Sequence, residues 1–227
     1  MEQRFSHILI TVIRKEKCYL EKRFSFSFVF ARTILYHSSV MNILTRYWPD
    51  AYAESVWTID YGKLYRMGYR GLIFDIDNTI VPHGEPSTPE ADALMAEIRA
   101  IGFRVLMLSN NSIARVTSFV ENMDVLYICN ADKPDPAAFE KAVEMLGTDK
   151  AQTLCIGDQV FTDILGANMA GIRSILVKFI GYYTEKHIGK RRQLEKVILR
   201  LYRLDGSRYN RLGQIEKQEK NNGRKEA

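Results

Sequence analysis

The stretch Gly71-Leu-Ile-Phe-Asp-Ile-Asp-Asn-Thr-Ile80 joins a short apolar run to two carboxylates that are one residue apart. An apolar run of this length is typical of a buried strand. In extended backbone, positions i and i+2 project to the same side, so Asp75 and Asp77 can face one ligand. Two such carboxylates repel each other unless a cation or a shared proton offsets their charge, so the stretch predicts a metal site at the end of a strand.

Further apolar runs of the same character follow this stretch, and helix-length segments separate them. The alternation predicts a Rossmann-like α/β fold, in which a parallel sheet with right-handed crossovers carries helices on both faces. Ligands of such sheets bind beyond the carboxyl ends of the strands. We expect strands at 71–75, 104–109, 125–129, 153–157 and 174–178, and helices within 56–67 and at 89–101, 113–123, 135–146 and 162–169.

Polar residues end three of the later runs. Ser109-Asn110 closes the second run, Lys133 follows the third, and Asp158 and Asp163 follow the fourth. A hydroxyl and backbone N–H groups can hold phosphoryl oxygens, a lysine can offset negative charge, and a further pair of acids can complete an oxygen-rich Mg²⁺ site. Each motif alone also fits a turn, a helix cap or a loop. Their order and their common place at strand ends together indicate a catalytic site.

In this order and context, the four motifs resemble those of the haloacid dehalogenase-like (HAD) hydrolase superfamily, over about residues 71–178. With Trp48-Pro49-Asp50 and Ile59-Asp60 included, the resemblance extends to roughly residues 44–200 and is closest to the YqeG-type phosphatases of subfamily IIIA. These proteins are similar to the mitochondrial phosphatases that act on phosphatidylglycerophosphate. The resemblance implies a HAD-like sheet and a phosphoric monoester hydrolase that uses Mg²⁺.

The resemblance also implies a role for each motif residue. Asp75 matches the nucleophile that forms an aspartyl-phosphate, and Asp77 matches the group that protonates the leaving oxygen and then activates water. Ser109, with the N–H of Asn110, would orient the phosphoryl group, and Lys133 would stabilise its charge. Two-step hydrolysis through a covalent intermediate is therefore the expected mechanism.

A magnesium site at the same strand ends follows from the resemblance as well. Asp75 and Asp158 would bind the metal through their side chains, and Asp77 would bind it through its backbone carbonyl. Asp163 would support the site from outside by holding a metal-bound water or Lys133.

Charge divides the chain into three parts. Residues 1–40 carry a net charge of +4, residues 41–180 carry −6, and residues 181–227 carry +7. Residues 1–40 fit the rest poorly, so one hypothesis is that Met41 is the true start; the alternative is a short targeting or membrane-touching arm. Residues 41–180 would form the phosphatase domain. The pattern of residues 186–204 predicts a basic amphipathic helix with the apolar face Leu194, Val197, Ile198 and Leu201. This helix would pack on the sheet or lie on an anionic membrane, and a frayed tail would follow it.

Cysteine usage and hydropathy favour the cell interior. The three cysteines Cys18, Cys129 and Cys155 form no CxxC pair and leave one thiol odd, which is typical of a reducing compartment. No apolar stretch is long enough to span a bilayer. We therefore expect a cytoplasmic protein, with peripheral contact with the inner face of the membrane as a further option.

The spacing between motifs bears on the substrate. A flap and one helix fill the interval from Asp77 to Ser109, and one helix and one strand fill that from Asn111 to Lys133, so no cap domain is expected. An open site can admit a lipid headgroup, and phosphatidylglycerophosphate is the candidate substrate. The alternatives are a soluble phosphatase of a small metabolite or nucleotide monophosphate, and a non-catalytic RNA- or ribosome-associated protein, although no RNA-binding motif supports the latter. The oligomeric state cannot be inferred from these patterns.

Overall fold

A computed structural model describes residues 44–180, 189–205 and 209–217. The expected extension at residues 1–40, the proposed start at Met41 and the end of the tail lie outside these residues. The chain divides into the units Met1–Thr45 and Arg46–Ala227, and the fold below is that of the second unit.

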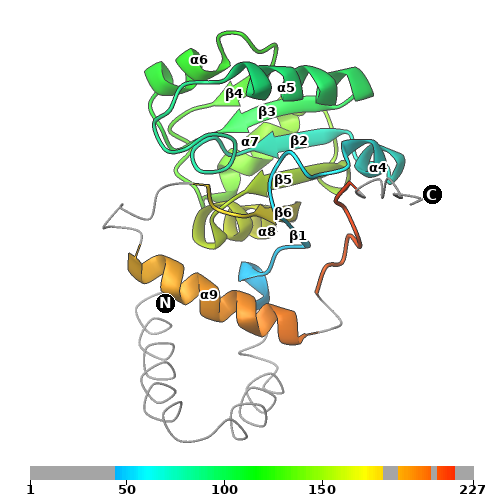
Figure 1. The fold of residues 1–227 in the computed structure, drawn as a ribbon, viewed down its shortest axis with the longest axis vertical. Helices are drawn as coiled ribbons and strands as arrows, with labels where there is room; N and C mark the ends of the chain where they lie inside the picture. Colours follow the sequence, from blue (N-terminus) through cyan, green and yellow to red (C-terminus); the bar gives the residue numbers. More distant parts are fainter. Residues whose placement is uncertain (1–43, 181–188, 206–208, 218–227) are drawn as a thin grey trace, which may run out of the picture. The chain divides into compact units, whose positions relative to one another are not determined.

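Six parallel strands form one sheet in the order β1-β6-β5-β2-β3-β4 (Figure 1). The strand β2, which the opening motif predicts, lies near the middle between β5 and β3. The predicted α/β class is therefore confirmed, and the carboxyl ends of the parallel strands meet along one edge. The strands are β1 (Ala51–Ala53), β2 (Gly71–Phe74), β3 (Arg104–Leu108), β4 (Leu126–Ile128), β5 (Thr153–Gly157) and β6 (Arg173–Val177).

Helices cover both faces of the sheet. Successive residues of β2 point to opposite faces, so Leu72 and Phe74 belong to one core cluster and Ile73 belongs to the other. Strands buried on both faces read as continuous apolar runs, which is why the sequence pattern locates them. The helices are α4 (Tyr61–Arg66), α5 (Pro89–Ile101), α6 (Ile113–Val120), α7 (Pro136–Leu146), α8 (Leu165–Ala170) and α9 (Gly189–Leu204), and a π-helical turn, η3 (Val160–Ile164), precedes α8.

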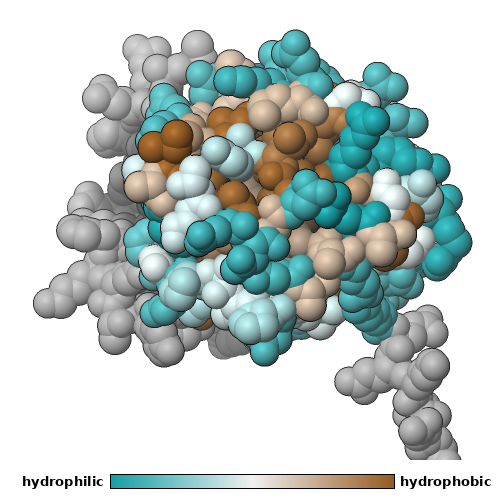
Figure 2. Space-filling view, turned by 90° about the horizontal axis from the view of Figure 1, so that it is seen from above, coloured by the Kyte–Doolittle hydropathy of each residue, from teal (hydrophilic) through white to brown (hydrophobic). Residues whose placement is uncertain are grey.

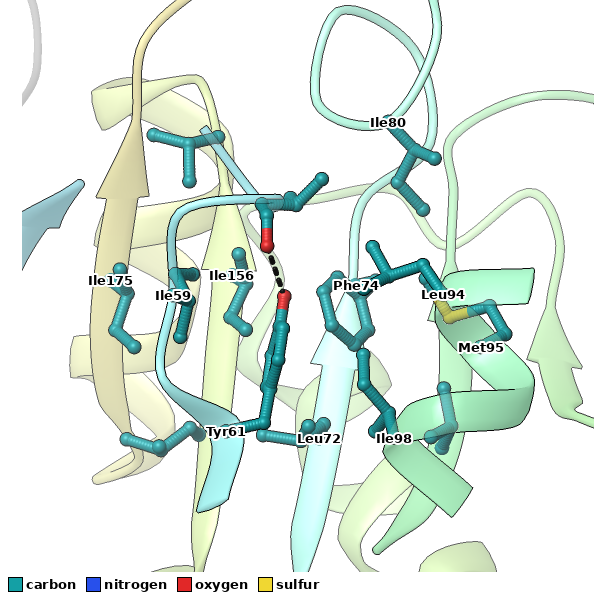
Figure 3. Close-up of a cluster of buried hydrophobic side chains, with 14 of the residues drawn as sticks. Ile59, Tyr61, Leu72, Phe74, Ile80, Leu94, Met95, Ile98, Ile156 and Ile175 are labelled. Atoms are coloured by element: carbon teal, nitrogen blue, oxygen red, sulfur yellow. Dashed lines mark hydrogen bonds between the residues drawn. The ribbon is translucent and has the colours of Figure 1, made fainter. Parts of the chain in front are cut away.

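The first core cluster lies between the sheet and helices α4, α5 and α6, and Figure 3 shows part of it. Tyr61 stands among aliphatic side chains, and its buried hydroxyl donates a hydrogen bond of 2.8 Å to the carbonyl of Val56. The ring of Phe74 lies beside it, with the ring centroids 6.3 Å apart. The last residue of β2 is thereby fixed immediately before Asp75.

Local signals explain where the helices begin and end. The hydroxyl of Thr88 accepts a hydrogen bond from Ala91 N at the start of α5, and Gly102 ends that helix in the left-handed conformation, with φ of 114°. Both ends of α5 agree with the prediction. The helix expected within 56–67 is shorter than that range and begins at Tyr61, because the carboxylate of Asp60 caps it.

The structure differs from the predicted elements at β1. The sequence indicates only a break at Pro49-Asp50, whereas Ala51–Ala53 form a strand parallel to β6. Asp50 is buried and accepts a hydrogen bond of 3.0 Å from Ser174 N, next to Arg173 of β6. A three-residue strand that is specified by a partner far along the chain leaves no local pattern.

The edge strand β4 carries two partly exposed apolar side chains, since Leu126 and Tyr127 keep 40% and 37% of their surface. Figure 2 views the molecule from the top of Figure 1, where α5, α6 and β4 lie, and shows apolar residues gathered near the middle of this face. The middle of this face is therefore less polar than its rim.

The helix α9 packs on the domain through one face. Ile198 and Tyr202 are buried, and the Tyr202 ring lies 5.9 Å from that of Trp48. The buried carboxylate of Glu195 accepts a hydrogen bond of 3.1 Å from Val160 N. Of the four residues of the expected apolar face, only Ile198 is buried. Leu194, Val197 and Leu201 are half-buried, so the helix packs through a face that is rotated from the expected one.

Close packing between α7 and α8 gives one stability prediction. A Cβ at Gly166 would lie 2.2 Å from the ring of Phe139, which is fully buried. We expect Gly166→Ala to lower the free energy of unfolding by about 1–3 kcal/mol, measured by urea denaturation. Gly62→Ala in α4 is the matched control, because its nearest neighbour is the flexible guanidinium of Arg66 at 3.3 Å. Equal losses in the two variants would contradict the packing explanation.

Candidate active site

The predicted catalytic residues meet at the carboxyl edge of the sheet. Asp75 follows β2, Lys133 follows β4 and Asp163 lies in η3 after β5. The Lys133 ammonium lies 2.6 Å from Asp75 Oδ1 and 2.7 Å from Asp163 Oδ1. All three side chains are buried, so a cation is held between two carboxylates away from bulk water.

A cluster of three carboxylates includes the same nucleophile candidate. Asp75, Asp158 and Asp163 each offer one oxygen, and these oxygens lie within 4.8 Å of one another. Thr79 links two of them, because its hydroxyl lies 2.9 Å from Asp75 Oδ2 and 3.4 Å from Asp158 Oδ1. Hard oxygen ligands at this separation are the set that Mg²⁺ prefers, so the residues present fit this metal.

The electrostatics of the cluster follow from its burial. Burial raises the pKa of Asp75 to about 6, and the charge of Asp163 adds to the rise while Lys133 opposes it. Burial alone would lower the pKa of Lys133, but Asp163 and Asp75 together outweigh it and raise that pKa. Lys133 therefore stays charged at neutral pH.

Asp163 is fixed by the backbone that surrounds it. Its Oδ2 accepts a hydrogen bond of 3.1 Å from Gln159 N, and its Oδ1 accepts one from Lys133. A Cβ at Gly157 would lie 2.4 Å from the Asp163 carboxyl carbon. Glycine at the end of β5 thus leaves the space that lets Asp163 fold back toward Lys133.

Ser109 and Asn110 have different surroundings. Ser109 is buried and its hydroxyl oxygen accepts a hydrogen bond of 3.2 Å from Asn111 N. The side chain of Asn110 holds both backbone groups of Lys133, accepting from its N–H at 2.7 Å and donating to its carbonyl at 3.2 Å. The sequence indicates a phosphate contact for the Asn110 N–H, and the side chain adds a link between the second and third motifs.

Asp77 faces a separate group of donors, which its position at a strand end does not predict. Its Oδ1 accepts from Gly84 N at 2.8 Å and from Arg115 Nη2 at 3.0 Å, and its Oδ2 accepts from the amide of Asn111. His83 Nδ1 lies 3.9 Å from Oδ1. Arg115 lies in the first turn of α6, which begins two residues after Asn111, so both side chains come from the segment that follows β3.

Comparisons with known proteins agree with this arrangement. The HAD-hydrolase-like family model matches residues 130–200. The chain is 36% identical over 130 residues to the probable phosphatase YqeG of Bacillus subtilis (strain 168), and the match covers 57% of this chain and 76% of YqeG. The chain therefore belongs to the HAD-like hydrolases, in the group of phosphatases that includes YqeG. It is a phosphatase of the HAD type, a phosphoric monoester hydrolase.

More distant relatives have several substrates in their names. The chain is 22% identical over 163 residues to phosphatidylglycerophosphate phosphatase 1, chloroplastic/mitochondrial, of Arabidopsis thaliana, covering 67% of this chain and 47% of that protein. It is 23% identical over 100 residues to glyceraldehyde 3-phosphate phosphatase of Pyrococcus abyssi (strain GE5 / Orsay), covering 40% of this chain and 42% of that protein. The chain thus spans less than half of each of these two relatives.

The sequence predicts that no segment spans a bilayer. Within 44–180, 189–205 and 209–217, no helix combines the length and the apolar character that crossing a bilayer requires.

Proposed function

We propose that the chain hydrolyses phosphomonoesters with Mg²⁺ through an aspartyl-phosphate on Asp75. The observation that carries the proposal is the buried ammonium of Lys133 between Asp75 and Asp163, beside a third carboxylate, Asp158. A phosphoryl group at this point would meet a nucleophile, a fixed cation and a set of hard oxygen ligands.

The first step of the proposed mechanism uses two carboxylates. An oxygen of Asp75 attacks phosphorus, the bond from phosphorus to the leaving oxygen breaks, and Asp77 donates a proton to that oxygen. In the second step Asp77 takes a proton from water, which attacks phosphorus and releases Asp75 and phosphate. Ser109 and the N–H of Asn110 orient the phosphoryl oxygens, and Lys133 stabilises their charge.

Three residues would hold the metal. Asp75 and Asp158 would bind Mg²⁺ through side chains and Asp77 through its backbone carbonyl, while Asp163 would hold Lys133 in place. Bound Mg²⁺ would offset the negative charge that gathers on the phosphoryl oxygens. The HAD superfamily generally uses this metal, and the neighbouring carboxylates of Asp75 and Asp158 support the same choice here.

The proposed substrate is phosphatidylglycerophosphate presented at a membrane surface. The match to the Arabidopsis enzyme supports this choice. The outer face of α9 supports it as well, because Lys196, Arg200 and Arg203 are exposed at helical spacing opposite the packed face. Each basic residue close to an anionic bilayer contributes about 1 kcal/mol of attraction, so the three together correspond to about 100-fold in vesicle affinity.

A phosphate-release assay tests the substrate. We expect the full chain with Mg²⁺ to hydrolyse phosphatidylglycerophosphate in anionic vesicles, and the triple variant Lys196→Gln, Arg200→Gln, Arg203→Gln to bind those vesicles about 100-fold more weakly. The matched control replaces three exposed lysines away from this stripe, Lys141, Lys150 and Lys217, by Gln. Equal turnover of soluble phosphoesters without vesicle binding would refute the lipid substrate and favour a small-metabolite phosphatase.

A further inference from the structure

Arg115 in α6 contacts Asp77, the proposed acid/base group. Its Nη2 lies 3.0 Å from Asp77 Oδ1 and 2.6 Å from the carbonyl of Glu85 in the loop after β2. Its side chain keeps 19% of its surface, and its Cζ lies 5.4 Å from the centroid of the buried Phe119 ring. The guanidinium is therefore held in place from three directions.

The hydrogen bonds of Asp77 show which of its oxygens can carry a proton. Oδ1 already accepts two bonds, from Gly84 N and Arg115, whereas Oδ2 accepts one bond, from Asn111, among the described residues. A carboxylate oxygen has two lone-pair sites, so the remaining site is on Oδ2. The leaving oxygen would therefore approach Oδ2, on the carboxylate whose other oxygen Arg115 holds.

Arg115 has donors beyond those that these bonds use. A guanidinium has five N–H groups, and both recorded bonds come from Nη2. Its Nε is buried and has no hydrogen-bond partner in the described part of the chain. Because Nε is covered by protein atoms, the donors that a ligand could meet are those of Nη1, which bond no described residue.

The two cations of the site have different neighbours. Lys133 lies between Asp75 and Asp163, where the phosphoryl group would bind. Arg115 contacts Asp77, where the leaving group would be. Lys133 would thus face the phosphoryl oxygens, and Arg115 would face a second anion on the leaving group.

We propose that Arg115 binds an anionic group on the leaving alcohol, so that the enzyme selects phosphomonoesters whose alcohol carries a second negative charge. The inference rests on the proposed function and names its substrate class. A guanidinium suits a phosphodiester or a carboxylate, because it stays charged and the N–H groups of Nη1, which bond no described residue, can make charge-assisted hydrogen bonds to an anionic oxygen. A lipid headgroup and a soluble metabolite can both present such a group.

The test measures binding to protein that carries Asp75→Asn, so that no turnover is needed. The probes are glycerol phosphate, whose leaving alcohol is uncharged, and glycerophosphoglycerol phosphate, whose leaving alcohol bears a phosphodiester. With Mg²⁺ present, we expect calorimetry to show about 10- to 100-fold tighter binding of the second probe. Adding Arg115→Met should remove this preference, whereas Arg115→Lys, which keeps the charge, should retain part of it.

Arg99→Met is the matched control, since Arg99 is a helix arginine that pairs with the exposed Asp124. It should leave the preference intact. The inference is overturned if Asp75→Asn protein shows no preference, or if Arg115→Met weakens binding of both probes by the same factor, which would make Arg115 only a positioning residue for Asp77.

Two further arms separate the possible sources and the possible failures. If binding of phosphatidylglycerophosphate in neutral vesicles weakens in Arg115→Met as binding of the deacylated probe does, Arg115 recognises the anion of the headgroup. If Arg115→Met weakens binding of the lipid but not of the deacylated probe, the inference is overturned. Wild-type turnover is measured in parallel. Its absence would refute the proposed function, whereas the binding preference would still decide the role of Arg115.

Discussion

Replacing Asp75 by Asn is expected to lower phosphate release by about 10⁴-fold or more while the protein remains folded. The amide cannot attack phosphorus, and the proposed mechanism has no other group in line to replace it. The measurement is single-turnover phosphate release at saturating Mg²⁺. Asp124→Asn is the control, because the Asp124 side chain is 85% exposed and lies outside the proposed site. Turnover by Asp75→Asn close to that of wild type would contradict the covalent mechanism.

The same substitution has an expected effect on stability that depends on pH. The pKa of Asp75 is raised from 3.8 to about 6, so the folded protein binds this proton more tightly than the unfolded chain does. Ionising Asp75 therefore costs stability as pH rises, and the cost is complete above about pH 6. In EDTA at pH 8, Asp75→Asn should unfold at a higher temperature than wild type, and the difference should shrink toward pH 4. A constant difference across this range would contradict the assignment of the shift.

Replacing Lys133 by Met is expected to have the second largest effect, on stability and activity together. Removing the ammonium leaves Asp75 and Asp163 as buried carboxylates without their cation, which costs about 3–5 kcal/mol of unfolding free energy. Loss of a fixed charge at the phosphoryl group should also lower turnover by about 100-fold or more. Lys150→Met is the control, because its exposed pair with Glu140 should contribute no more than about 1 kcal/mol.

A double variant separates the two effects of Lys133. Adding Asp163→Asn to Lys133→Met removes one of the two uncompensated charges, so urea denaturation should show that part of the lost stability returns. Turnover should stay low, because no cation then faces the phosphoryl group. Recovery of activity together with stability would show that Lys133 acts only on the fold.

Topology made much of the site predictable. Because apolar runs mark strands that are buried on both faces, the residues that follow those runs had to gather at one edge of the sheet. The meeting of Asp75, Lys133 and Asp158 with Asp163 follows from that rule and needs no knowledge of side-chain conformations. The strand β1 was missed because its three residues depend on pairing with β6, far along the chain.

The residues that contact Asp77 could not be predicted from the order of the strands. Arg115 lies in a helix and reaches Asp77 only through a long side chain, and Gly84 contributes a backbone N–H from a loop. The side chain of Asn110 faces the Lys133 backbone, a contact that strand order does not determine. Such contacts depend on side-chain and loop conformations, which hydrophobic periodicity does not specify.

The contact between Glu195 and Val160 N has a consequence for anyone who shortens the chain. Val160 begins η3, two residues after Asp158 and three before Asp163, and the carboxylate that meets its N–H comes from α9. A fragment that stops after the last strand would leave this buried amide without its acceptor, beside the loop that carries two of the cluster's three acids. We therefore expect a fragment without α9 to hold Asp158 and Asp163 less firmly than the full chain does.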